Sequence, residues 1–160
     1  MKILVVQNKM GVGDMVIYLP FIKAISKKFN TTVSILVKES SKAEQFLKNN
    51  NYIDKIIILE RDNKLKNGRH EGLIGSYNLV KDLKKFDFDK VFIFNSSFRF
   101  NLIVRAAGIK NIYQYPLLQK KDQHVIQAAK KLLKKNLDLS VETNPEISIN
   151  DYSVKEARSR

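Results

Sequence analysis

The chain begins MKILVVQNKMGVGDMVIYLP (Met1–Pro20), and this stretch decides the fold. An apolar run, Ile3–Val6, ends in a short loop that carries Gly11, Gly13 and Asp14. A helical pattern follows at once, with apolar residues spaced for one face at Met15, Leu19, Ile22 and Ile25. Strand, glycine loop and helix in this order open a doubly wound α/β domain, which places its ligands at the carboxyl ends of its strands.

The same alternation of strand and helix continues along the chain. Further apolar runs predict strands at Val33–Val37, Lys55–Leu59, Val91–Phe94 and Ile112–Tyr115. Helical patterns lie between them, at 40–49, 73–85, 98–107 and 122–136. Strands separated by helices predict a parallel sheet with right-handed crossovers and helices on both faces. We therefore predict a Rossmann-like α/β fold, a doubly wound parallel sheet.

Pro20 interrupts the first helical pattern. Proline lacks a backbone N–H, and its ring clashes with the carbonyl four residues earlier, here that of Val16. We therefore expect either an irregular first turn around Asp14 or a regular helix that starts near Pro20.

The length and composition indicate one globular domain. The 160 residues are 44% hydrophobic, which is enough for a buried core. We expect this domain to span 1–150, with a short strand at Glu146–Ile149, and a linker to begin at 151–160. Cysteine is absent and the two histidines, His70 and His124, are far apart, so no metal site or cofactor is predicted. The apolar start is too short for a signal peptide and no run reaches membrane-spanning length, which favours a cytoplasmic protein.

A net charge of +13 predicts anionic partners. The candidates are nucleic acid, anionic lipid headgroups and phosphorylated sugars, although lysine-rich coding bias would also account for the charge. The helix expected at 122–136 gathers lysines on one side, at Lys130, Lys131, Lys134 and Lys135. That side could make peripheral contact with an anionic inner membrane. It could equally be a solvated basic face, because the core needs the apolar stripe of the same helix.

Asp14 is the candidate for chemistry because it lies in the loop after the first strand. As the N-cap of the first helix, its carboxylate would accept backbone N–H bonds worth about 1 kcal/mol. As a general base, it could remove the proton from an acceptor hydroxyl while that hydroxyl attacks a sugar carbon. Gly11 and Gly13 allow positive φ and a close approach of the backbone to a ligand. The loop lacks both GxGxxG and GK[ST], so neither a dinucleotide site nor a P-loop is predicted.

Basic and hydroxyl side chains elsewhere are candidates for binding an anion. Ser96, Ser97 and Arg99 follow the fourth predicted strand, and the N–H groups opening the next helix could hold a phosphate or carboxylate. The serines could also simply cap that helix. Lys9 could contact an anion or be solvated. The long loop 60–76 carries further positive charge, at Arg61, Lys64, Lys66, Arg69 and His70, and loops of this length inside compact domains are usually functional or mobile.

Several stretches together resemble a known family. The pattern KILVV, a short loop, GD and then LP-x-I-x-A-I runs from Lys2 to Ile25. The segment Phe86–Pro116 contains a strand, a loop, a helix, the letters AGI and a short strand, and His124-Val-Ile-Gln with Leu132-Leu133 forms the next helical pattern. In this order and spacing, the chain resembles the N-terminal domain of the family-nine glycosyltransferases, the ADP-heptose:lipopolysaccharide heptosyltransferases and their relatives. The resemblance covers nearly all of the chain to about residue 150.

The resemblance implies one half of a GT-B enzyme with two Rossmann-like domains. In such an enzyme the N-terminal domain binds the acceptor and the C-terminal domain binds the nucleotide-sugar. The resemblance also implies inverting catalysis without a metal, with Asp14 as the base. The chain has no counterpart of the nucleotide-sugar domain, so we expect a truncated form that is inactive alone. Its loop 8–14 also differs from the commoner Ser-rich loop of the family, which leaves the acceptor open.

The sequence therefore predicts the acceptor-binding half of a heptosyltransferase-like glycosyltransferase that acts on a lipopolysaccharide-type or related glycan. Asp14 would be the base, in a loop shaped by Gly11 and Gly13. An anionic glycolipid or sugar acceptor would be recognised by Lys9, Ser96, Ser97, Arg99, Arg61, Lys64 and Arg69. The nucleotide-sugar donor would bind only through the missing domain. The alternative is a non-catalytic basic α/β module that binds nucleic acid or another polyanion, but the basic residues are scattered and lack interleaved aromatic residues, so nucleic acid is not expected.

Overall fold

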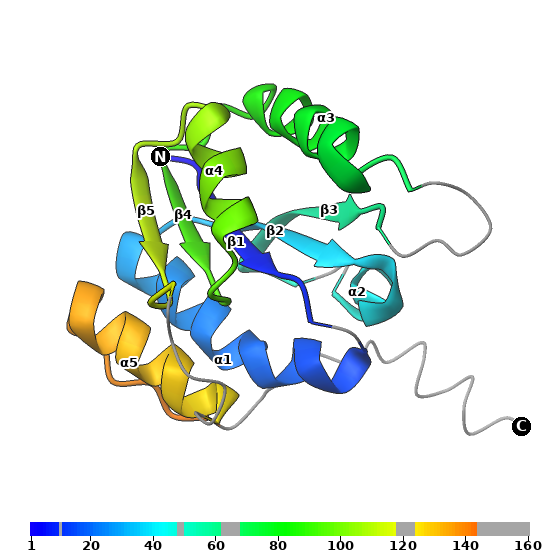
Figure 1. Cartoon of the computed structure of the whole chain (residues 1–160). Coiled ribbons are helices and arrows are strands. Elements are labelled where there is room, and N and C mark those ends of the chain that lie inside the picture. Colours follow the sequence, from blue (N-terminus) through cyan, green and yellow to red (C-terminus); the bar gives the residue numbers. More distant parts are fainter. Residues whose placement is uncertain (10, 48–49, 62–67, 118–123, 144–160) are drawn as a thin grey trace, which may run out of the picture.

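One sheet of five parallel strands forms the centre of the molecule in the computed structural model (Figure 1). The structure describes residues 1–9, 11–47, 50–61, 68–117 and 124–143. The strands are β1 (Ile3–Gln7), β2 (Val33–Lys38), β3 (Ile53–Leu59), β4 (Lys90–Ile93) and β5 (Asn111–Gln114). Their order across the sheet is β3-β2-β1-β4-β5, and every neighbouring pair is parallel. The predicted Rossmann-like α/β fold is confirmed.

Helices cover both faces of the sheet: α1 and α5 lie on one face, and α3 and α4 lie on the other (Figure 1). Because side chains alternate along a strand, β1 sends Ile3 and Val5 into the core under α1, and Leu4 and Val6 into the core under α3 and α4. None of the helices in the described part of the chain combines the length and apolar character that a membrane-spanning segment needs. The helices are α1 (Val12–Phe29), α2 (Ala43–Phe46), α3 (Gly72–Lys84), α4 (Phe98–Ala106) and α5 (Val125–Leu137).

The predicted elements are present, with some ends displaced. The helix expected at 40–49 is shorter and is split into a 3-10 turn, Glu39–Ser41, and α2. The third strand begins at Ile53, two residues earlier than predicted. The strand expected at Glu146–Ile149 and the linker expected at 151–160 lie outside the described residues.

Pro20 does not break α1, contrary to the expectation of an irregular first turn or a late start. The helix runs without interruption from Val12 to Phe29, with Pro20 buried inside it. A proline in a helix interior costs about 3 kcal/mol. Burying one large apolar side chain contributes roughly 1.5–3 kcal/mol, so packing against the sheet outweighs this local cost. The large side chains of α1 that are fully buried are Met15, Tyr18, Leu19, Phe21, Ile22 and Ile25.

The order of the strands reverses between β1 and β4. From β1 the chain proceeds to β2 and β3 on one side, and it then crosses to β4 and β5 on the other. A doubly wound sheet binds its ligands in the crevice at such a switch point, outside the carboxyl ends of the strands. The segments that follow β1 and β4 flank this point, and they contain the predicted site residues Lys9, Gly11, Ser96 and Ser97.

Candidate functional site at the switch point

Hydrogen bonds of amide side chains join the loops at the switch point. Asn95, after β4, donates from Nδ2 to Oδ1 of Asn8, after β1, at 3.1 Å. Oδ1 of Asn95 accepts from the backbone N–H of Ser97 at 2.9 Å. Gln114, which ends β5, donates from Nε2 to the carbonyl oxygens of Asn95 and Ser97, at 3.1 and 2.9 Å. Asn8 and Gln114 were not singled out as site residues from the sequence, although polar side chains at the carboxyl ends of strands were an available signal.

Asp14 is the third residue of α1 and does not cap the helix. The N-cap position belongs to Gly11, and α1 has no side-chain cap. The Asp14 side chain is half-buried, and it forms no hydrogen bond or ion pair with any described residue. The interpretation of Asp14 as an N-cap is therefore wrong. The carboxylate still lies in the first turn, where the positive end of the helix dipole favours a negative charge.

The two glycines of the loop have different roles. Gly11 has a φ of 99°, a conformation that side-chain-bearing residues rarely adopt, so the turn into α1 requires glycine here. Gly13 does not have a positive φ, and a Cβ built on it would meet no atom within 4 Å. Lys9, before the turn, is exposed.

Three polar side chains are buried without hydrogen-bond partners among the described residues: Gln7 at the end of β1, Tyr18 on α1 and Tyr115 after β5. The two tyrosine rings pack against Phe94, with ring centroids 5.0 and 6.1 Å from it. Burial raises the pKa of both tyrosines; the Tyr18 hydroxyl raises the pKa of Tyr115 further, and the Asp14 carboxylate adds to the rise at Tyr18. The two hydroxyls interact electrostatically but do not meet the geometry of a hydrogen bond. The Asp14 carboxylate is thus close enough to the buried Tyr18 hydroxyl to favour its neutral form.

The amino end of α4 also lacks a side-chain cap. Ser97 occupies the N-cap position, but its side chain forms no capping hydrogen bond, and Ser96 is exposed. The Ser97 side chain therefore does not cap α4, unlike in the alternative considered from the sequence. Two helices, α1 and α4, begin at the switch point with first-turn N–H groups that no side-chain cap covers.

Arg99, in the first turn of α4, is largely occupied by contacts within the protein. Its Nε donates to Oγ of Ser76 at 2.9 Å, and its Nη2 donates to the carbonyl oxygens of His70 and Gly72, at 2.6 and 3.2 Å. Burial lowers the pKa of the Arg99 guanidinium, and the positive charge of Arg61 lowers it further. Arg99 therefore fastens the start of α3 to α4, and a contact between Arg99 and an acceptor stays a prediction.

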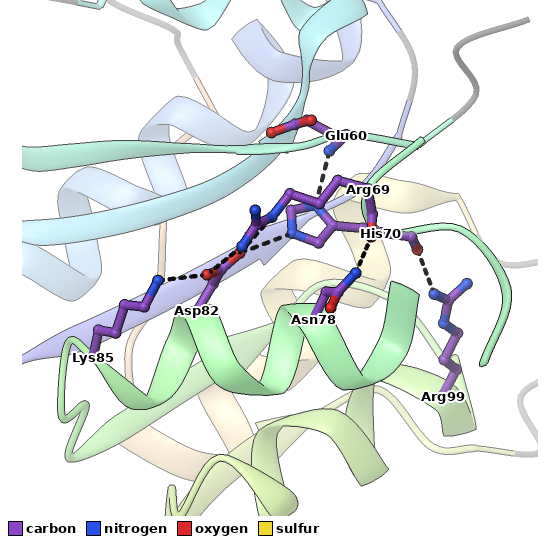
Figure 2. A network of polar contacts seen from close by, with 7 residues as sticks. All are labelled: Glu60, Arg69, His70, Asn78, Asp82, Lys85 and Arg99. Atoms are coloured by element: carbon purple, nitrogen blue, oxygen red, sulfur yellow. Dashed lines mark hydrogen bonds and ion pairs between the residues drawn. The ribbon is translucent and has the colours of Figure 1, made fainter. Parts of the chain in front are cut away.

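A second network fastens the segment between β3 and α3 (Figure 2). His70 is buried between the end of β3 and α3; its Nδ1 accepts from the backbone N–H of Glu60 at 3.0 Å, and its Nε2 lies 3.3 Å from Oδ2 of Asp82. Arg69 holds the same carboxylate with Nε and Nη2 at 2.7–3.0 Å, and Lys85 reaches it at 2.8 Å. Burial opposes the ionisation of Asp82, but these three partners outweigh it and hold its pKa well below the usual range.

The basic residues predicted between β3 and α3 thus fall into three groups. Arg69 is paired with Asp82 on α3, so the structure shows it in an anchoring role. Arg61 lies 3.7 Å from the Glu71 carboxylate, and the positive charge of Arg61 lowers the pKa of Arg99. Lys64 and Lys66 lie outside the described residues. Periodicity and composition could not reveal the anchoring roles, because the partners lie on other elements.

Gly75 allows α3 to pack against this anchored segment, and Gly75→Ala tests that packing. A Cβ on Gly75 would lie 2.1 Å from the carbonyl carbon of His70 and 2.6 Å from its oxygen, and neither backbone atom can move freely. We expect the substitution to lower the free energy of unfolding by about 2 kcal/mol, because overpacking against a backbone forces the segment to shift. Urea unfolding followed by far-UV circular dichroism measures the change.

The matched control is Gly13→Ala in α1. That position has open space and no positive φ, so we expect unchanged stability or a gain of up to about 1 kcal/mol from the better helix former. Equal stability of the two variants would contradict the packing assigned to Gly75.

The sheet order and the reversal between β1 and β4 define a Rossmann-like domain, a class of fold that binds ligands at the switch point, where α1 and α4 begin without side-chain caps. No protein-family model and no curated protein matches the chain by sequence. Solved structures do match: a family 9 glycosyl transferase from Veillonella parvula DSM 2008 is similar with a TM-score of 0.72 and 17% identity, over 99% of this chain and 48% of that one.

Two Escherichia coli enzymes share the same fold. ADP-heptose lps heptosyltransferase II is similar with a TM-score of 0.66 and 16% identity, over 99% of this chain and 50% of that one. Heptosyltransferase WaaC with ADP is similar with a TM-score of 0.60 and 16% identity, over 98% of this chain and 52% of that one. The chain thus spans about half the length of these structures, and it matches their N-terminal domain. The resemblance predicted from the sequence is confirmed at the level of the fold, that of one half of a GT-B glycosyltransferase.

Proposed function

We propose that this domain is the acceptor-binding half of an inverting glycosyltransferase, with Asp14 as its general base. The observation that carries the proposal is the state of Asp14: a half-buried carboxylate, without a hydrogen bond or ion pair to any described residue, beside the switch point of a fold shared with family 9 glycosyltransferases. A carboxylate that capped α1 would accept hydrogen bonds from backbone N–H groups, and this one accepts none from the described residues.

Glycosyl transfer to a hydroxyl requires one proton acceptor on this half of the enzyme. An acceptor hydroxyl attacks the anomeric carbon of the donor sugar, the bond from that carbon to the nucleotide diphosphate breaks, and Asp14 takes the hydroxyl proton. The nucleotide diphosphate leaves on the donor half, with the electron pair of the broken bond. The first turn of α1 holds Asp14 on a rigid element, which suits a base that must meet the hydroxyl within about 3 Å.

An anionic group on the acceptor would find two kinds of partner near the base. The first backbone N–H groups of α4 come directly after Ser96 and Ser97 in the chain. No side chain caps them, so they are available to an anion. Arg61 lies close enough to Arg99 for their charges to oppose one another, and the Glu71 carboxylate, 3.7 Å from Arg61, offsets only part of this positive charge. Lys9 is exposed on the other side of the switch point. These N–H groups and basic side chains support a phosphorylated or carboxylated sugar as the acceptor.

Titration of the isotopically labelled chain with soluble phosphorylated and carboxylated sugars tests acceptor binding by NMR. We expect the largest amide shifts in the loop 8–14 and at Ser96–Ser97, and smaller shifts with the corresponding neutral sugars. Shifts on α5 instead, together with tight and steeply salt-dependent binding of single-stranded nucleic acid, would favour a polyanion-binding module.

A further inference from the structure

The outer faces of α3 and α4 carry an exposed apolar patch. The patch consists of large side chains that are between 51% and 91% exposed: Leu73, Ile74, Tyr77, Phe98 and Leu102. Leu73 and Tyr77 are four residues apart on α3, and Phe98 and Leu102 are four residues apart on α4, so each pair lies on one side of its helix. The two helices lie side by side on the same face of the sheet (Figure 1). Large apolar side chains exposed together on two neighbouring helices are typical of an interaction site.

Positive charge continues the same helix faces. On α3, Lys81 follows Tyr77 by one turn and is itself followed by Lys84; on α4, Arg105 follows Leu102. All three basic side chains are exposed. The one acidic residue of the two helices, Asp82, is held by Arg69, His70 and Lys85. Apart from small residues, the exposed side chains of both helices are therefore apolar or basic.

We propose that this face of α3 and α4 binds peripherally to an anionic lipid bilayer, with the patch in the interfacial region and Lys81, Lys84 and Arg105 against the headgroups. Leucine, isoleucine and phenylalanine favour the acyl boundary, and tyrosine favours the headgroup level. Each lysine or arginine near an anionic surface adds attraction. A net charge of +13 acts in the same direction.

The same charges argue against a second copy of the chain as the occupant. A two-fold interface would bring each patch, with its flanking lysines and arginine, against an identical one. Without exposed acidic residues on the two helices, these charges would repel one another. The face of α5 is a weaker candidate, because its apolar residues, Ala128, Ala129, Leu132 and Leu133, are buried in the core, as the solvated alternative considered from the sequence requires.

The placement is compatible with the candidate site. In a parallel sheet the helices that follow each strand begin at the carboxyl edge, so Leu73, Ile74 and Phe98 lie at the same edge as Asp14. Membrane contact there would present a lipid-anchored acceptor to that edge. Vesicle binding itself does not require catalysis, and Asp14→Asn should bind vesicles as the wild type does, so this inference and the proposed function can fail separately.

A tryptophan reporter tests insertion directly, because the chain contains no tryptophan. Vesicles of phosphatidylcholine mixed with phosphatidylglycerol should shift the emission of Leu73→Trp to shorter wavelength. Leu117→Trp, an exposed position outside the two helices, should show no shift. Absence of a shift at Leu73→Trp, or equal shifts at both positions, would overturn the proposal.

Vesicle sedimentation tests the contributions of the apolar and the basic residues. Leu73→Ser with Ile74→Ser should lower partitioning at least ~10-fold without unfolding the protein, because both side chains are highly exposed. Lys81→Glu with Lys84→Glu should lower it by a similar factor. Lys131→Glu with Lys135→Glu on α5 changes the net charge equally and should have a smaller effect. Equal losses from the two charge variants would contradict the assignment to the face of α3 and α4. Loss of a dimer in place of vesicle binding when the patch is changed would contradict a bilayer as the occupant.

Discussion

Replacing Asp14 with asparagine is expected to lower glycosyl transfer at least ~100-fold, the usual scale for loss of a general base. Asparagine keeps the size of the side chain but cannot take the proton from an acceptor hydroxyl. The loss should fall on turnover, with little change in the acceptor concentration at half-maximal rate. The assay supplies the nucleotide-sugar half of the enzyme, on the same polypeptide or as a separate chain, and measures release of the nucleotide diphosphate.

Folding should barely change in this variant. Asp14 has no hydrogen bond to lose among the described residues, and its interaction with the dipole of α1 contributes about 0.3–1 kcal/mol. Asp87→Asn is a matched control, because Asp87 is exposed and has a φ of 54°, which asparagine also adopts readily. If Asp14→Asn retained the turnover of this control, Asp14 would be a surface carboxylate and the proposed mechanism would be wrong.

Replacing Asp82 with asparagine should cause the largest loss of stability, about 2–3 kcal/mol at neutral pH. The Asp82 carboxylate accepts charge-assisted bonds from Arg69 and Lys85 and lies against the buried His70 ring. Asparagine offers one acceptor oxygen in place of two. Its N–H₂ group would face Arg69 or Lys85, which are donors and cannot accept a hydrogen bond from it. Urea unfolding with an unchanged denaturant slope would report this loss as a lower midpoint.

The stability difference should depend on pH, because the pKa of Asp82 is depressed in the folded protein. A carboxylate of this kind stabilises the fold fully above its ordinary pKa of about 4, and the contribution disappears as the pH falls toward the lower folded value. The gap between wild type and Asp82→Asn should therefore narrow below about pH 4. Asp138→Asn, at an exposed carboxylate whose pKa is lowered by Lys134, should show a much smaller gap, because solvent screens an exposed ion pair. A gap that stayed constant down to acid unfolding would contradict the role assigned to the Asp82 network.

Local patterns were sufficient to predict the elements and the edge of the sheet where the site lies. Apolar runs such as Ile3–Val6 and Val91–Phe94 are strands, and Asp14 and Ser97 lie where the following helices begin. These predictions rest on periods of two and about 3.6 residues, which are properties of neighbouring positions. Pro20 was misjudged for the opposite reason: its local cost is real, but the burial that outweighs it depends on the whole sheet.

The uses of the charged and apolar side chains could not be predicted in this way. Arg69 and Arg99 looked like residues for an external anion, yet one is held by Asp82 and the other by backbone carbonyls 27 and 29 residues away. Leu73 and Phe98 begin the predicted helices 73–85 and 98–107, but the sequence pattern did not reveal that both side chains are exposed. A sequence pattern shows which side chains share one side of a helix or strand, but it does not show what packs against that side.

By itself, the sequence determined an α/β domain of alternating strands and helices, with a carboxylate and a glycine turn after the first strand. Only the tertiary structure decided that β1 and β4 are neighbours, that Asp14 has no partner among the described residues, and that the apolar patch on α3 and α4 is uncovered. The physical reason is the range of the interactions. Strand and helix propensity act between residues close in the chain, whereas pairing, burial and exposure depend on contacts that form only when distant segments meet.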